Sequence, residues 1–172
     1  MKFYKVSLEQ FTKDYLKCNG YEDDYNLEID DNLSKDIIDM WENIKLPKRS
    51  TSGSAGYDFF APFDLWISGV VAKTFPTGIR FECDKDKFLM CVPRSGQGFK
   101  HGVRLLNTVG IIDQDYFYSD NEGHIMCKMI ANDYVDIQQG KAFMQGIILP
   151  YFKVDNDDSD EVRNGGFGST GM

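Results

Sequence analysis

The segment NTVGIIDQDY, residues 107–116, brings together three side chains whose types could recognise and activate a ligand. Asn107 precedes Asp113 by six residues, and Tyr116 follows that carboxylate by three. An amide can donate and accept hydrogen bonds at the edge of a base, and a carboxylate can act as a general base. This pattern suggests a nucleoside pocket. The alternative interpretation is a hairpin with an apolar Ile-Ile strand and two surface acids.

The segment PRSGQGFKHG, residues 93–102, follows an apolar run and combines an arginine, a hydroxyl group and several glycines. Such glycines let backbone amides face an anion, so the segment indicates contact with a phosphate. A polar turn with one solvated arginine is the competing interpretation, and a single motif cannot separate the two.

Three further segments carry weaker signals. AGYDFFAP, residues 55–62, puts a glycine beside an acid at a strand entry, which is mostly structural when taken singly. GKAFMQGIILP, residues 140–150, has the composition of a buried strand, and its Gln145 must find a partner or face a polar cleft. RNGGFGSTG, residues 163–171, could close over a phosphorylated ligand, although its composition is also that of a disordered linker.

The elements that position these segments are expected to be strands. From Ala55 onward, brief apolar runs alternate with Gly, Pro, Asn and Asp, which predicts an all-β body built as a barrel or jelly-roll sandwich. The acidic stretch VDNDDSDE and the glycine-rich end that follows it are expected to form a mobile tail.

The N-terminal part has a different pattern. FYKV, residues 3–6, alternates like a short strand, and Ser7 with Gln10 predicts a capping box for a helix that runs to about Lys17. A second helix is expected to be capped by Ser34 and ended by Pro47. Its inward residues are predicted to be Ile37, Ile38, Trp41 and Ile44.

Composition limits the classes of protein that remain. The 172 residues, 42% of them hydrophobic, can bury one ordinary core, and the net charge of -8 with no basic stripe argues against binding nucleic acid or an anionic membrane. The four cysteines lack paired spacing, so free buried thiols are expected rather than a zinc or thioredoxin-type site. No stretch approaches the ~20 apolar residues of a membrane helix, which favours a cytoplasmic protein.

Taken together, the five motifs resemble, in the same order, the five signature motifs of the trimeric dUTP diphosphatase (dUTPase) family. The resemblance covers residues 46–171, and order with spacing is far more specific than any one motif. It implies one all-β domain over residues 1–172, a dUTPase-like jelly-roll β-barrel that forms a homotrimer with shared active sites. Residues 7–44 would be an added helical segment, and residues 155–172 a flexible tail that carries the fifth motif.

The resemblance also implies an activity, the Mg2+-assisted hydrolysis of dUTP to dUMP and pyrophosphate. Asp113 looks like the general base, Asn107 like the amide that reads uracil, and Tyr116 like the ring that packs on deoxyribose. Asp58 would order the site indirectly, and Mg2+ would be held mainly by the phosphates and water rather than by a dedicated set of protein ligands. The remaining positions that match substrate-binding residues of the family are Arg94, Ser95, Gly96, Gly110, Ile112, Gln145, Arg163, Phe167, Gly168, Ser169 and Thr170.

The chain departs from the family pattern in places. Ala142 stands where the fourth motif commonly has an arginine, and Arg163 precedes Phe167 by four residues rather than five. Two other functions therefore stay open: a nucleotide-binding regulatory trimer with little turnover, and a relative of dCTP deaminase, which shares the barrel. The match of residues 107–116 to the diphosphatase motif favours the hydrolase.

Overall fold

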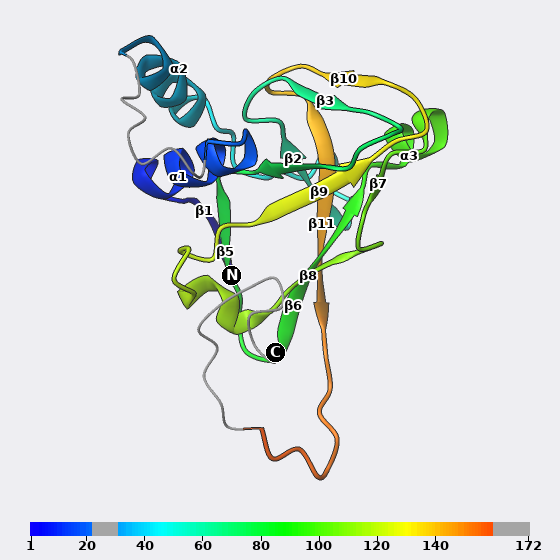
Figure 1. The fold of residues 1–172 in the computed structure, drawn as a ribbon. Coiled ribbons are helices and arrows are strands. Elements are labelled where there is room, and N and C mark those ends of the chain that lie inside the picture. Colours follow the sequence, from blue (N-terminus) through cyan, green and yellow to red (C-terminus); the bar gives the residue numbers. More distant parts are fainter. Residues whose placement is uncertain (22–30, 160–172) are drawn as a thin grey trace.

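The computed structural model describes residues 1–21 and 31–159. Strands cross one another to form a barrel-like body, and two helices lie together at one side of it (Figure 1). The predicted all-β jelly-roll class is confirmed, with the helices as an addition to it. The fifth motif, residues 163–171, lies outside the described residues.

The strands are short, as expected from apolar runs interrupted by turn residues. They are β1 (Lys2–Lys5), β2 (Gly56–Phe60), β3 (Leu65–Ile67), β4 (Lys73–Pro76), β5 (Ile79–Glu82), β6 (Lys87–Pro93), β7 (Arg104–Leu105), β8 (Gly110–Ile112), β9 (Met126–Ile130), β10 (Val135–Ile137) and β11 (Ala142–Pro150). The helical elements are α1 (Leu8–Cys18), α2 (Asp31–Glu42), α3 (Ser95–His101) and the 3-10 helix η1 (Gln114–Tyr118).

Four of the strands form the sheet that carries most of the motifs. Its order is β2-β11-β6-β8, and every neighbouring pair is antiparallel. Side chains of successive residues in a strand point to opposite faces. In β6 the inward residues Leu89 and Cys91 are buried, whereas Met90 and Val92 between and after them are half-buried.

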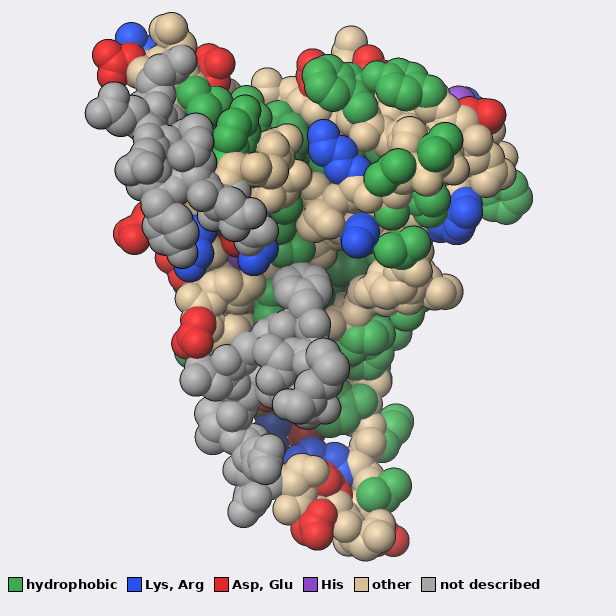
Figure 2. All heavy atoms as spheres, in the orientation of Figure 1, with side chains coloured by type: hydrophobic (Ala, Val, Ile, Leu, Met, Phe, Trp, Pro, Cys, Tyr) green, Lys and Arg blue, Asp and Glu red, His purple; other side chains and the backbone are tan. Residues whose placement is uncertain are grey.

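The inner face of this sheet and the strands across the barrel form one hydrophobic core. The core includes Phe59 from β2, Leu89 from β6, Met144 from β11 and Met129 from β9, each at most 1% exposed. Hydrophobic side chains also reach the surface, and Figure 2 shows a group of them over β3 and β10, where Trp66 of β3 is exposed.

The N-terminal strand and first helix are integral to this core. β1 pairs antiparallel with β5, and α1 packs against β4. The predicted cap is confirmed, because the Ser7 hydroxyl accepts the N–H of Gln10 at 3.1 Å. The reciprocal half of the capping box was wrong, because the Gln10 side chain donates to Asp14 and the Ser7 N–H donates to Glu122.

The second helix differs from its prediction at both ends. α2 begins at Asp31, so Ser34 lies inside the helix rather than at its cap, and it ends at Glu42, five residues before Pro47. Ile37 and Ile44 are buried as expected, whereas Ile38 is 39% exposed. Neighbouring helical residues are about 100° apart around the axis, so one narrow apolar face cannot bury both isoleucines.

This difference gives a matched pair of substitutions. Ile37→Val should lower the free energy of unfolding by about 0.5–1.5 kcal/mol, because it removes one methyl group from a closed core. Ile38→Val should change it by less than about 0.5 kcal/mol, since that side chain is exposed. Urea denaturation of both variants measures the effect, and equal losses would contradict the observed orientation of α2.

Two expectations from composition can be compared with the structure. All four cysteines are free, as predicted; Cys91 and Cys127 are buried, but Cys18 and Cys83 are only half-buried. Within the described ranges, no helix is long and apolar enough to cross a membrane.

Candidate functional site

The third motif forms a tight turn between β7 and β8, which pair with β9 and β6 rather than with each other; the segment 104–112 is here called the hairpin. β7 leads through a tight turn to β8, with the Thr108 N–H donating to the Leu105 carbonyl at 3.0 Å. The Val109 N–H donates to the Asn107 carbonyl at 2.8 Å, and Thr108 between them has a φ of 69°. A β-branched residue rarely adopts positive φ, so this turn is held in a strained conformation.

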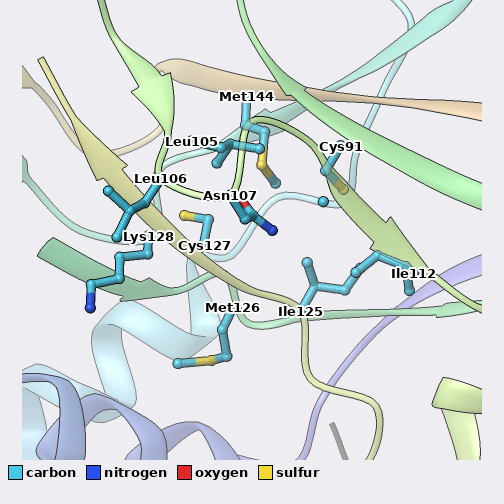
Figure 3. Close-up of a pocket in the computed structure, with 11 residues that line it drawn as sticks. Cys91, Leu105, Leu106, Asn107, Ile112, Ile125, Met126, Cys127, Lys128 and Met144 are labelled. Carbon is cyan, nitrogen blue, oxygen red and sulfur yellow. The ribbon is translucent and has the colours of Figure 1, made fainter. Parts of the chain in front are cut away.

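A pocket of about 320 Å3 lies under this hairpin (Figure 3). The side chain of Asn107 lies among otherwise mostly apolar residues, with Cys91, Cys127 and Met144 around it. The remaining residues that line the pocket are Leu105, Leu106, Gly110, Ile112, Ile125, Met126 and Lys128. Its volume is at the low end of the range for small-molecule pockets, about 300–1,000 Å3.

The pocket walls remain apolar because their thiols stay protonated. Burial raises the pKa of the Cys91 thiol to about 12, and burial likewise raises the pKa of Cys127. A neutral, apolar wall with one amide is suited to a flat heterocycle whose edge offers hydrogen-bonding groups.

Asp113 and Tyr116 lie at the end of the same hairpin and share one turn of structure. Asp113 is the N-cap residue of η1, and its carbonyl accepts the Tyr116 N–H at 3.2 Å. Tyr116 is 4% exposed, and its hydroxyl donates to the His124 carbonyl at 2.9 Å and accepts from the Asn121 amide at 2.8 Å. The phenol is therefore fixed at its hydroxyl, and the residue as a whole is almost fully buried.

A second group of polar residues, here called the anion cluster, consists of Asp58, Arg94, Ser95, Gly96 and Gln145. Arg94 Nε lies 3.2 Å from a carboxylate oxygen of Asp58, which orients the guanidinium at the end of β6. Gln145 of β11 is paired with Asp58 on one side and with Val92 on the other. Ser95 and Gly96 open α3, where the first N–H groups of a helix have no intrahelical acceptor.

Gly56 of the first motif makes space in this cluster. A Cβ atom at Gly56 would collide with the carboxamide of Gln145. Gly56, which looked mostly structural in the sequence, thus leaves room for Gln145 of the fourth motif. Asp58, on the same strand, forms an ion pair with Arg94 of the second motif.

The hairpin pocket and the anion cluster lie on opposite faces of the sheet. Met144 lines the pocket and Gln145 belongs to the cluster, although the two residues are consecutive in β11. In β6, Cys91 lines the pocket while Val92 pairs with Gln145. Because consecutive strand residues face opposite ways, one chain presents these two groups to different sides.

The outer face of the sheet, beside the anion cluster, carries a strip of apolar residues. Ile147 of β11 pairs directly with Met90 of β6, and Met90 pairs with Ile111 of β8. Ile111 is 50% exposed, and the other two are half-buried. We name Met90, Ile111 and Ile147 the outer strip.

Several predicted features fall outside the geometry above. Arg163, Phe167, Gly168, Ser169 and Thr170 lie outside the described residues. Across residues 1–21 and 31–159, no group of three or more His, Cys, Asp or Glu side chains is arranged to hold a metal ion. The contacts of Asn121 and His124 with Tyr116 were not predicted, because no spacing in the sequence marks them.

Comparison with known proteins agrees with this architecture. The fold and the positions of the first four motifs place the chain among all-β barrel proteins of the jelly-roll class. The chain belongs to the dUTPase family, whose model matches residues 42–171. The prediction of this family from the sequence is confirmed.

Individual relatives support the assignment. The deoxyuridine 5'-triphosphate nucleotidohydrolase of Lactococcus lactis is 37% identical over 143 residues, which are 79% of this chain and 95% of that protein. That of Hahella chejuensis is 38% identical over 140 residues, 77% of this chain and 90% of that protein. The dUTPase structure from Streptococcus mutans has a TM-score of 0.59 and 35% identity, and the match covers 67% of this chain and 91% of that one.

Proposed function

We propose that this protein is a dUTP diphosphatase, which hydrolyses dUTP to dUMP and pyrophosphate. The observation that carries the proposal is the hairpin pocket: a cavity of about 320 Å3 with a single carboxamide, Asn107, and a carboxylate, Asp113, at the end of the same hairpin. The relatives named above, which carry this activity in their names, support the same conclusion.

The residues of the site divide the work of the reaction. Asn107 reads the uracil edge, with the hairpin backbone at Gly110 and Ile112 beside it, and the ring of Tyr116 packs on the deoxyribose. Asp113 takes a proton from a water molecule as that water attacks the α-phosphorus. The bond from the α-phosphorus to the bridging oxygen breaks, and pyrophosphate leaves with that oxygen.

The phosphate chain is held by the anion cluster. The guanidinium of Arg94, the Ser95 and Gly96 N–H groups and the Gln145 carboxamide are donors suited to phosphate oxygens. Asp58 does not contact the substrate in this scheme; its ion pair at 3.2 Å fixes Arg94. From the tail, Phe167 covers the uracil, while Arg163, Gly168, Ser169 and Thr170 bind the phosphates.

The active protein is a homotrimer with shared sites in this proposal. The hairpin pocket and the anion cluster face opposite sides of one sheet, so a nucleotide in the pocket of one chain meets the cluster of a neighbouring chain. The outer strip of Met90, Ile111 and Ile147 gives that face an apolar surface which a second copy can cover.

Mg2+ is the cofactor in this proposal. The residues of the anion cluster fit an ion that is held by the phosphates of the nucleotide rather than by a protein carboxylate. Asp58 of that cluster is paired with Arg94, and Mg2+ commonly binds substrate phosphates while keeping several waters. Bound there, the ion would neutralise phosphate charge during the attack.

A substrate panel tests the function. With Mg2+ present, pyrophosphate release from dUTP should exceed release from dCTP, dTTP and UTP by at least about 100-fold. In this proposal the pocket rejects the thymine methyl, cytosine presents a different edge, and the ring of Tyr116 excludes a 2'-hydroxyl. Tight binding of dUTP without release would indicate a regulatory protein instead, and deamination of dCTP would indicate the deaminase relative.

A further inference from the structure

The N-terminal helix holds the loop that fixes Tyr116. This loop, residues 119–124 and here called the clamp loop, runs from the end of η1 toward β9. In Figure 1 it lies below α1, on the same side of the barrel. Its hydrogen bonds with the N-terminal segment come from Ser7 and Asp14, which lie far outside the part of the chain that the family model matches.

The first contact is made at Glu122. The Ser7 hydroxyl donates to this carboxylate at 2.5 Å and the Ser7 N–H donates at 2.8 Å. Arg80 lies 3.8 Å from the same carboxylate and donates to the Phe117 carbonyl of η1 at 2.7 Å. Burial alone would raise the pKa of Glu122, but the hydrogen bonds from Ser7 and the charge of Arg80 outweigh it and hold that pKa below its ordinary value.

The second contact is made at His124, whose side chain is fully buried. The Gly78 N–H donates to Nε2 at 2.8 Å, so this nitrogen is an acceptor and the proton lies on Nδ1. Nδ1 then donates to Asp14 at 2.6 Å, and the Gln10 amide donates to the same carboxylate oxygen at 2.7 Å. Both ring nitrogens are satisfied, so the imidazole has a single orientation.

The clamp loop is packed directly on η1. A Cβ atom at Gly123 would lie 2.6 Å from the Tyr116 carbonyl and 2.7 Å from the Phe117 Cα, so backbone meets backbone there. The Tyr116 hydroxyl is held between the His124 carbonyl and the Asn121 amide. A shift of the clamp-loop backbone at His124 would therefore move the acceptor that holds the phenol.

We infer that Asp14 and His124 are positioning residues for sugar recognition: through the clamp loop they hold the Tyr116 ring where it excludes a 2'-hydroxyl. This inference rests on the proposed function. A steric gate discriminates by clashing with the wrong ligand, and it works only while the ring cannot move aside. Helix α1, outside the matched family region, supplies that restraint.

The test compares kcat/KM for dUTP and UTP in Asp14→Ala, Asp14→Asn and the wild-type protein. Asp14→Ala leaves the Nδ1 proton of His124 without its acceptor, so the dUTP to UTP ratio should fall by about tenfold or more. Asp14→Asn retains an oxygen acceptor and should keep most of the ratio. An unchanged ratio in folded Asp14→Ala would overturn the inference.

Trp41→Phe is the matched control for general weakening of the N-terminal segment. It removes the hydrogen bond from Trp41 to the Val6 carbonyl, 2.9 Å, and does not touch the clamp loop. It should lower the melting temperature and leave the ratio intact. If Trp41→Phe lowered the ratio as much as Asp14→Ala, the effect would be general destabilisation and the inference would fail.

Tyr116→Phe tests the same inference without changing α1. It keeps the ring but removes the hydroxyl that His124 and Asn121 hold, so the dUTP to UTP ratio should again fall; a wild-type ratio would overturn the inference even if Asp14→Ala did not fold. Hydrolysis of dUTP by the wild-type protein distinguishes a failure of the proposed function from a failure of this inference. Its absence would overturn the proposed function and this inference together, whereas its presence with an unchanged ratio would overturn this inference alone.

Discussion

Asp113→Asn is expected to lower kcat for dUTP hydrolysis by at least about 100-fold while dUTP binding changes little. Loss of a general base typically costs a factor of about 10² to 10⁴. Asparagine has nearly the same shape and can stay at the N-cap of η1, so the hairpin and its pocket should be retained. Pyrophosphate release gives kcat, and calorimetry with a non-hydrolysable α,β-imido analogue of dUTP gives the affinity.

Asp115→Asn is the matched control for this experiment. It makes the same change of charge two residues further on, at an exposed position in the first turn of η1. Its turnover should stay within about threefold of wild type, since a surface substitution away from the reacting groups has little effect. Equal losses in the two variants would assign the effect to charge and remove Asp113 from the role of base.

Much of the barrel could be predicted from local patterns. The brief apolar run FLMCVP predicted the strand β6, whose residues from Leu89 to Val92 alternate between buried and half-buried. The cap at Ser7 was also predictable, because the cap and the N–H that it accepts are three residues apart in sequence. Each of these features is decided within a few residues.

The errors lie where distant segments compete with local patterns. Gln10 can reach the cap of its own helix, but its side chain instead binds the buried carboxylate of Asp14. That carboxylate also binds His124, which lies 110 residues after Asp14 in the sequence. Ser34 is a good cap residue, yet α2 begins three residues earlier at Asp31. Ile38 fits an apolar pattern, although only Ile37 of this pair reaches the core.

The candidate site also combines residues that short sequence segments predict with contacts that depend on distant segments. The residue types and the order of motifs gave Asp113, Asn107 and Arg94, because each belongs to a short segment with chemical meaning. The ion pair of Arg94 with Asp58 and the clearance that Gly56 gives Gln145 depend on strand pairing. Likewise, no spacing in the sequence marks His124, and its link to Tyr116 depends on the folded clamp loop.

Two inactive variants should restore activity when they are mixed, because the site needs groups from different chains. In Asp113→Asn the base is lost, and in Arg94→Gln the phosphate contact is lost, so each parent should fall at least about tenfold. In trimers assembled at random from equal amounts, about one quarter of sites combine an intact Asp113 with an intact Arg94 from the neighbouring chain. Co-expressed, differently tagged chains should therefore recover about a quarter of wild-type kcat.

The control for this experiment is a mixture of two variants that both change the anion cluster. Arg94 directly follows β6 and contacts Asp58, the strand partner of Gln145 on β2, so Arg94 and Gln145 both belong to one chain's contribution. Mixing Arg94→Gln with Gln145→Ala should give no recovery, since no chain carries both groups. Arg94→Gln should recover activity when it is mixed with Asp113→Asn but not when it is mixed with Gln145→Ala. This pair of results follows only if the hairpin and the anion cluster of one site come from different chains. Activity that stays at the parental average in both mixtures would place the whole site in a single chain.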